Sequence, residues 1–260
     1  MKTLITILLT SIFGNVFSQN PDIKKSWVGN YLEFISIDSQ RVNFEVFGNY
    51  PKQKKYYLIG DTLRLYDKYS TSRDNFKKQY IKNYDFLITT LTESYLTLIA
   101  IDSNSLQLSG GKKKIEYCER HLVEQPKIQF ETVKFISTNC YGKCPSLTLQ
   151  IDKEKRLLFI GRRYAIKQGF YAATLSDSLF QSLIDILELS ELDKLKTWKQ
   201  QVYDAPEYTL EIHYNGKVKY LKNFFLPAVT HELIKYLLEI SKKVDLKETK
   251  EPFEISFATE

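Results

Sequence analysis

Residues 133–163 read VKFISTNCYGKCPSLTLQIDKEKRLLFIGRR, and this stretch decides how the second half of the chain is expected to fold. It predicts a strand, then a turn bracketed by Cys140 and Cys144, and then a hairpin across the charged segment 152–155. Apolar Leu147, Leu149 and Ile151 alternate with polar residues, which is the pattern of a strand with one buried face. We therefore expect an antiparallel sheet to begin here.

The two cysteines lie four residues apart, with Gly142 between them and Pro145 directly after. An extended strand would separate their Cα atoms by roughly 13 Å, whereas a disulfide needs them within about 7 Å. A compact turn brings them within reach, because Gly142 can adopt a positive φ and Pro145 ends backbone donation before the next strand.

Three interpretations of the Cys140 and Cys144 pair remain open, and a structural disulfide is the one we favour. A metal site is the second, although two thiols without a nearby histidine fall short of a four-ligand set. A redox-active pair is the third, although Cys-x3-Cys differs from the Cys-x-x-Cys of thioredoxin-like enzymes.

The motif CYGKCPSLTLQID, followed by a charged turn and RLLFIG, resembles an uncharacterised bacterial family, domain of unknown function 6438. The shared features are an aromatic residue and a glycine between two cysteines, then a proline and an alternating strand. The resemblance extends from about residue 127 to residue 243. It implies a fold and carries no established activity.

The first 18 residues read as a secretory signal peptide, with Lys2 before an apolar run and a small residue, Ser18, before Gln19. The apolar run is shorter than the ~18 residues of a membrane span, and no cysteine stands at the cleavage point. We expect an exported protein, periplasmic or secreted, without a membrane span or lipid anchor. Export permits a disulfide, and Cys118 is then expected to be an inert thiol on a strand; the alternative is a bond to Cys140 or Cys144.

The formal net charge is +6, from 37 basic and 31 acidic residues, and no basic pole stands out in either half. Nucleic-acid binding is therefore not expected. The polar joint Gln125-Pro126 predicts a boundary between two domains. The expected division is a signal peptide over 1–18, a β-meander over 27–122, an α+β domain with the cysteine turn over 127–246, and a tail over 247–260.

The first domain is expected to be all-β, an antiparallel meander that forms a barrel or a curled sheet. With Trp27-Val28-Gly29 near its start, it resembles the small lipocalin-like domains of exported bacterial proteins. We expect side chains to fill its interior. The predicted strands are 31–37, 42–47, 55–59, 63–66, 80–89, 95–101, 105–108 and 113–122.

The second domain is expected to be α+β, an antiparallel sheet with two helices on one face. Ser176 predicts the N-cap of the first helix, and Pro227 is expected to open the second. Between them, Asn215-Gly216 predicts a tight hairpin turn. The tail is expected to add an edge strand over 254–257.

No catalytic or metal-binding motif is present, and neither a metal nor a cofactor is expected. The three histidines, His121, His213 and His231, are interpreted as surface or half-buried residues. The loop 203–207 is a candidate functional loop, with Asp204 and Glu207 as its carboxylates. The alternative role for Asp204 is to cap backbone amides.

Two hypotheses of function follow. The first is an exported, non-enzymatic binding or interaction protein of unknown ligand or protein partner, with Tyr141, Gly142, Asp204 and Glu207 as candidate contact residues. The second is an unrecognised enzyme or a thiol-redox protein that uses Cys140 and Cys144. The absence of a recognisable active site favours the first.

Overall fold

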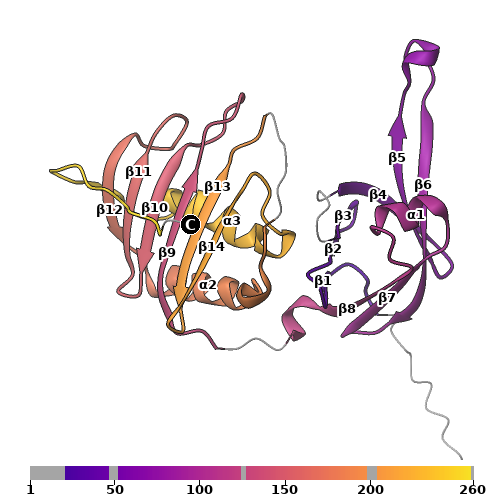
Figure 1. Ribbon diagram of the computed structural model, residues 1–260, viewed down its shortest axis with the longest axis horizontal. Helices are drawn as coiled ribbons and strands as arrows, with labels where there is room; N and C mark the ends of the chain where they lie inside the picture. The colour runs from indigo at the N-terminus through magenta and orange to yellow at the C-terminus, as the bar shows by residue number, and fades with distance from the viewer. Residues whose placement is uncertain (1–20, 47–51, 124–126, 198–203, 259–260) are drawn as a thin grey trace, which may run out of the picture.

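The computed structural model describes residues 21–46, 52–123, 127–197 and 204–258. Within these ranges an all-β part precedes an α+β part, which confirms the expected fold class (Figure 1). The predicted signal peptide, the joint Gln125-Pro126 and Tyr203 lie outside the described residues.

The first part is a closed antiparallel barrel of eight strands, each paired with its neighbours in chain order. β1 pairs with β8 and closes the barrel, so that Val28 lies opposite Cys118. The strands are β1 (Ser26–Gly29), β2 (Phe34–Ile37), β3 (Arg41–Glu45), β4 (Lys52–Ile59), β5 (Thr62–Tyr69), β6 (Tyr80–Leu91), β7 (Tyr95–Ala100) and β8 (Lys114–Glu119).

Large side chains occupy the interior of the barrel. Trp27, Phe44 and Phe86 are almost completely buried there, and the rings of Phe44 and Phe86 lie 5.5 Å apart. The indole nitrogen of Trp27 donates to the carbonyl of Ile23 at 3.0 Å, which satisfies its one polar group. The inward residues therefore form a packed core, as expected from the aromatic composition of the strands.

The expected strand at 105–108 is wrong, because these residues belong to helix α1 (Ser103–Leu108). Asp102 caps this helix: its carboxylate accepts from the N–H of Ser105, and the Ser105 hydroxyl accepts from the N–H of Asp102. This reciprocal capping stabilises one short turn that a pattern of alternating residues does not reveal. The eighth strand of the barrel is instead β1, which holds Trp27.

The second part is a seven-stranded antiparallel sheet in the order β14-β13-β9-β10-β11-β12-β15. The Asn215-Gly216 turn between β13 and β14 has positive φ at both residues, as the sequence predicts. The strands are β9 (Phe130–Ser137), β10 (Leu147–Asp152), β11 (Arg156–Gly161), β12 (Gly169–Thr174), β13 (Tyr208–Tyr214), β14 (Lys217–Asn223) and β15 (Lys247–Glu248).

Helices α2 (Asp177–Glu188) and α3 (His231–Glu239) cover one face of this sheet (Figure 1). Ser176 caps α2 as predicted, and Pro227 precedes the short 3-10 turn Ala228–Thr230 that leads into α3. Leu187 of α2 and Leu237 of α3 are fully buried in the core beneath them. No helix in the described ranges is long and apolar enough to cross a membrane.

The expected edge strand at 254–257 is also wrong. The edge is formed by β15, which pairs with β12, and the chain then crosses the sheet face opposite the helices (Figure 1). Lys134 on that face donates to the carbonyl of Ser256 at 2.7 Å, and the N–H of Ala258 donates to the Glu211 carboxylate. Side-chain contacts, rather than a strand ladder, hold the tail.

The barrel and the sheet domain share an interface. Val28, Leu32 and Phe34 of the barrel are buried in the same apolar cluster as the core of the sheet domain. The buried Arg120 guanidinium donates to the carbonyl of Val229 at 3.1 Å. The buried Glu45 carboxylate accepts from the N–H of Ala228 at 2.9 Å. Barrel side chains therefore bind the backbone that leads into α3.

Removal of Glu45 from water raises its pKa to about 7, although the hydrogen bond from Ala228 opposes this shift. The folded state therefore holds a proton that the unfolded chain releases above its ordinary pKa of 4.5. It follows that the contribution of Glu45 to stability falls as the pH rises from 4.5 to about 7.

We expect Glu45→Gln to raise the free energy of unfolding at about pH 8 by roughly 1–3 kcal/mol, because the amide oxygen still accepts from Ala228 without a buried charge. The gain should vanish at about pH 4, where the native carboxyl is protonated. Urea unfolding at both pH values measures the difference, with the exposed Glu251→Gln as control. Equal gains at the two pH values would contradict the account.

Candidate functional site

A disulfide joins Cys140 and Cys144 in the turn between β9 and β10, with their Cα atoms 5.6 Å apart. Gly142 can adopt a positive φ, but the observed turn does not use that freedom, because Gly142 is not among the residues with positive φ. A Cβ at Gly142 would lie 3.6 Å from Cys140 Sγ, an ordinary van der Waals distance, so the turn does not exclude a larger residue there. Tyr141 is 96% exposed at the apex of the turn.

Cys118 is a free, half-buried thiol on β8. Burial and the neighbouring Glu119 carboxylate raise its pKa, which disfavours the reactive thiolate. Because Cys140 and Cys144 are bonded to each other and Cys118 is free, the alternative bond from Cys118 to either of them is wrong.

The structure brings the cysteine turn and the candidate loop together. The N–H of Tyr141 donates to Asp204 Oδ1 at 2.8 Å. Asp204 thus holds a backbone amide of the other segment rather than one in its own loop.

Glu207, the last residue of the candidate loop, contacts Thr138 at the start of the cysteine turn. Its N–H donates to Thr138 Oγ1 at 2.8 Å, and its carbonyl accepts from the N–H of Thr138 at 3.1 Å. Its carboxylate lies 3.8 Å from Lys222 Nζ. The backbone of Glu207 therefore extends the pairing of β9 and β13 beyond the strands, and its carboxylate is turned away from the cysteine turn.

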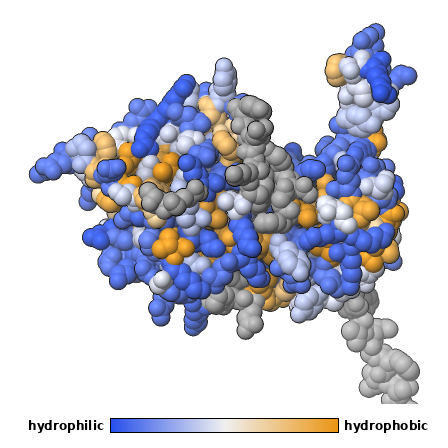
Figure 2. Space-filling model, in the orientation of Figure 1, coloured by the Kyte–Doolittle hydropathy of each residue, from blue (hydrophilic) through white to orange (hydrophobic). Residues whose placement is uncertain are grey.

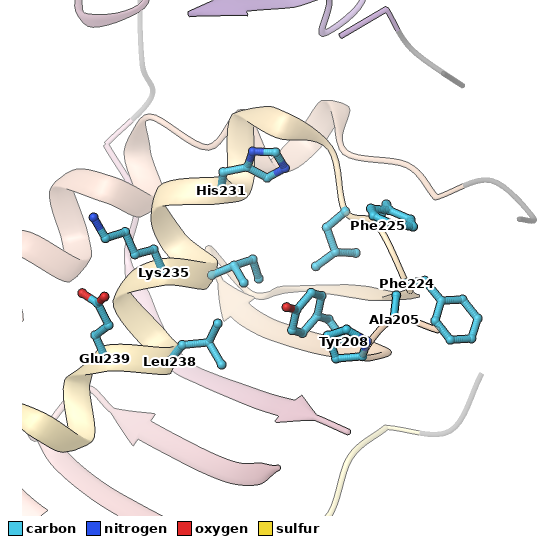
Figure 3. A pocket seen from close by; sticks show the side chains of 11 residues that line it. Ala205, Tyr208, Phe224, Phe225, His231, Lys235, Leu238 and Glu239 are labelled. Carbon is cyan, nitrogen blue, oxygen red and sulfur yellow. The ribbon is translucent and has the colours of Figure 1, made fainter. Parts of the chain in front are cut away.

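Beside this loop lies a pocket of about 430 Å³, between α3 and the ends of β13 and β14 (Figure 3). We call it the α3 pocket. Apolar side chains make up most of its lining, which comes from three segments of the chain. The lining residues are Ala205, Pro206, Tyr208, Phe224, Phe225, Leu226, His231, Ile234, Lys235, Leu238 and Glu239.

The wall formed by α3 follows from helical periodicity. Residues 231, 234, 235, 238 and 239 are spaced by three or four, so they share one side of the helix. Leu233, Leu237 and Ile240 are fully buried on the other side. Helix α3 thus has an apolar side against the core, and on the pocket side it contributes Ile234 and Leu238 together with three polar residues.

The opposite wall is aromatic. The ring of Tyr208 stacks on the fully buried ring of Phe135, with centroids 5.7 Å apart and an interplanar angle of 20°. This stacking fixes Tyr208 and presents its other side to the pocket, beside Phe224 and Phe225 (Figure 3). Burial raises the pKa of the Tyr208 hydroxyl, which therefore stays protonated at neutral pH.

Three titratable groups lie along α3 at the pocket. Packing around the His231 ring and the nearby Arg120 charge lower the pKa of His231, although the residue as a whole is exposed to solvent. The ring is therefore mainly neutral at neutral pH. Lys235 and Glu239 lie at the edge of the pocket that is furthest from Phe224 and Phe225 (Figure 3). The site thus has an apolar floor and a polar rim.

A second polar cluster, which the sequence analysis did not predict, lies on the sheet face beneath the tail. Glu211 is fully buried there, and its carboxylate accepts from Lys134 Nζ at 2.8 Å and contacts His213 Nε2 at 2.6 Å. Burial alone would raise the pKa of Glu211, but the hydrogen bonds from Lys134, His213 and Ala258 outweigh it and lower the pKa. These partners stabilise the ionised carboxylate of Glu211, so we assign the cluster a structural role.

The remaining histidine, His121, is exposed and follows β8. Its backbone N–H donates to the Glu119 carboxylate at 2.9 Å. Within the described ranges no group of three or more His, Cys, Asp or Glu residues could hold a metal ion. The mainly apolar lining of the α3 pocket suits contact with an apolar group.

The described residues thus define a two-part protein: a filled eight-stranded barrel, followed by an α+β sheet domain with a surface pocket. Residues 131–244 match the family described as "Domain of unknown function (DUF6438)". The resemblance found in the second half of the sequence is thereby supported. No curated protein matches the chain, and no solved structure matches it.

We expect the double substitution Cys140→Ser and Cys144→Ser to lower the free energy of unfolding, because the unfolded chain is no longer restricted by the bond. The expected loss is only about 2 kcal/mol, because the closed loop is very short. Urea unfolding without a reducing agent measures the loss, and Cys118→Ser serves as the control that leaves the disulfide intact. An unchanged stability would contradict a structural role for the bond. So would a reduction potential within the range of roughly −270 to −120 mV that is typical of dithiol oxidoreductases.

Proposed function

We propose that the protein is an exported, non-enzymatic binding protein that holds an apolar ligand in the α3 pocket. The observation that carries the proposal is the pocket itself, with about 430 Å³ of space and a mainly aliphatic and aromatic lining. Small-molecule sites in proteins have volumes of about 300–1,000 Å³ and the same mixture of an apolar body with few polar groups.

The α3 pocket suits a ligand better than the barrel does. The resemblance of the barrel to lipocalin-like domains would suggest a ligand inside it, but Trp27, Phe44 and Phe86 occupy that space. We propose that the filled barrel has a structural role and positions the start of α3 through Glu45 and Arg120.

The lining defines the chemistry of the ligand. An aromatic or branched aliphatic group would lie against Tyr208 and between Leu226 and Leu238. A polar end would remain at the rim beside Lys235 and Glu239, where it keeps its contact with water. The ligand class is thus a small amphiphile, or one apolar side chain of a protein partner.

The cysteine turn supports the pocket and takes no part in chemistry. It holds Asp204 through the N–H of Tyr141, and Asp204 directly precedes the pocket residues Ala205 and Pro206. A short disulfide in this turn reduces the freedom of the loop, which lowers the entropy lost when a ligand binds.

Export is part of the same proposal, with a periplasmic or secreted location and no lipid anchor. Its support is the charged, apolar and small-residue pattern of residues 1–18, together with a disulfide that an oxidising compartment preserves. The intact mass of the protein recovered outside the cytoplasm tests it. A chain that starts at Gln19 is the expected result, and a chain that retains Met1 would contradict it.

We expect the apolar fluorescent probe anilinonaphthalene sulfonate to bind the folded protein, and Leu238→Asp to weaken binding at least about tenfold, because the new charge would be desolvated by the probe. Fluorescence titration measures the dissociation constant. The matched control is Leu58→Asp, which alters an exposed leucine on the barrel.

A second variant, Ala205→Trp, fills the same pocket with an apolar group and should weaken the probe without adding charge. Circular dichroism and thermal unfolding show that each variant is folded. If both variants bind the probe as tightly as the native protein does, the α3 pocket is not the binding site.

A further inference from the structure

The hairpin of β5 and β6 extends well beyond the barrel and ends in a projecting turn (Figure 1). We call residues 68–82 the tip. The strands remain paired up to Tyr69 and Tyr80, so the projection is an ordered ladder. No part of this projection is needed to close the barrel or to form the α3 pocket.

Large apolar side chains are exposed at the tip. Phe76 is 67% exposed and Ile81 is 60% exposed, and Tyr69 and Tyr80 are also exposed. In the space-filling view a single apolar group stands at the end of the hairpin among hydrophilic residues (Figure 2). Isolated exposed apolar residues are common. Here Tyr80 and Ile81 are adjacent in β6 and therefore expose apolar groups on opposite faces of the hairpin, while Phe76 lies in the turn between the strands.

The backbone of the tip places Phe76 at the apex. Its φ is 60°, and that of Asn75 before it is 53°, in the left-handed region that is unfavourable for a bulky side chain. Hydrogen bonds from the N–H of Phe76 to the carbonyl of Thr71 at 2.9 Å, and from Lys77 to Asp74 at 3.1 Å, hold this geometry. The turn therefore maintains a strained conformation that presents an aromatic ring to solvent, as strained residues at functional sites do.

The tip is also strongly basic, a local concentration of charge that the count over each half of the chain does not reveal. It holds five basic residues, Lys68, Arg73, Lys77, Lys78 and Lys82, against one acidic residue, Asp74. Four of the five basic residues are exposed, and Lys82 is half-buried. This charge is local, since the whole chain has a net charge of only +6. A partner of the tip should therefore carry negative charge.

We infer that the tip docks onto the surface of a membrane that contains anionic lipids. Aromatic and aliphatic side chains at an apex can enter the boundary between head groups and acyl chains, while the surrounding lysines and arginine attract anionic head groups. A projecting end suits a flat surface, whereas a polymer would need a groove along which to lie.

The arrangement of the tyrosines disfavours single-stranded nucleic acid as the partner. Such binding uses open aromatic faces on which bases stack. Tyr69 and Tyr80 instead stack on each other across the hairpin, with centroids 5.6 Å apart and an interplanar angle of 30°. This contact occupies one face of each tyrosine ring and leaves only the other for a base, whereas Phe76 and Ile81 are the most exposed apolar side chains of the tip.

The inference is independent of the α3 pocket and is tested by co-sedimentation of the full chain with vesicles. We expect binding to vesicles made of equal parts phosphatidylcholine and phosphatidylglycerol at low ionic strength, and little binding to phosphatidylcholine alone. At about 0.5 M salt, where charges are screened within a few ångströms, binding should fall at least about fivefold.

Two variants separate the apolar and the charged contributions. Phe76→Ser should lower the partition coefficient about tenfold, and Lys77→Glu with Lys78→Glu should lower it by at least as much. The matched controls are Ile59→Ser, which alters an exposed apolar residue at the end of β4, away from the tip, and Lys153→Glu on the sheet domain; neither should change binding.

Binding that is lost in the tip variants and kept in the controls supports the inference. The absence of binding to anionic vesicles would overturn it, as would binding that persists in both tip variants. A tip-dependent affinity for a single-stranded oligonucleotide without any for vesicles would overturn it as well, and would assign the tip to nucleic acid.

Discussion

The pairing of β9 on both of its edges is the constraint on which the second half of the structure depends. Ser137, the last residue of β9, lies opposite Leu147 of β10 and also opposite Tyr208 of β13. Because both pairs are antiparallel, the cysteine turn that follows β9 and the loop that precedes β13 meet at the same end of the sheet. The contact of Tyr141 with Asp204, and the aromatic wall at Tyr208, are consequences of this register.

The barrel influences the α3 pocket through the backbone it binds. Glu45 and Arg120 are buried at the interface and hold Ala228 and Val229, which stand between the pocket residue Leu226 and helix α3. Buried charges of this kind contribute little net stability, but they specify one arrangement because the loss of either partner leaves the other unpaired. The two domains are therefore not independent of each other, since side chains of the barrel position one wall of the pocket in the sheet domain.

The sequence predicted those parts of the fold that local rules determine. Ser176 as a helix cap and the Asn215-Gly216 turn were correct because each depends on a few adjacent residues. The helix at Ser103–Leu108 was missed because one reciprocal cap at Asp102, rather than a repeating apolar pattern, stabilises it. The path of the tail was missed because Lys134 and Glu211, which hold it, lie more than 40 residues away in the chain.

The candidate site was predictable only in its parts. Cys140, Cys144 and Asp204 could be chosen from residue type and spacing, but their contact depends on the register of three strands. The pocket side of α3 was hidden, because Ile234 and Leu238 fit the same apolar pattern as the core residues beside them. The pocket wall can be recognised only from the tertiary structure, in which the ends of β13 and β14 lie opposite α3.

The central claim is that an apolar ligand binds in the α3 pocket and not inside the barrel. Mapping of amide chemical shifts by nuclear magnetic resonance, during a titration with anilinonaphthalene sulfonate, tests this claim most directly. The account predicts that the largest shifts fall on Tyr208, Phe224, Leu226 and Leu238, with the barrel residues Phe44 and Phe86 unchanged. Shifts concentrated at Phe44 and Phe86 would contradict it, because they would place the ligand in a barrel whose interior is already filled.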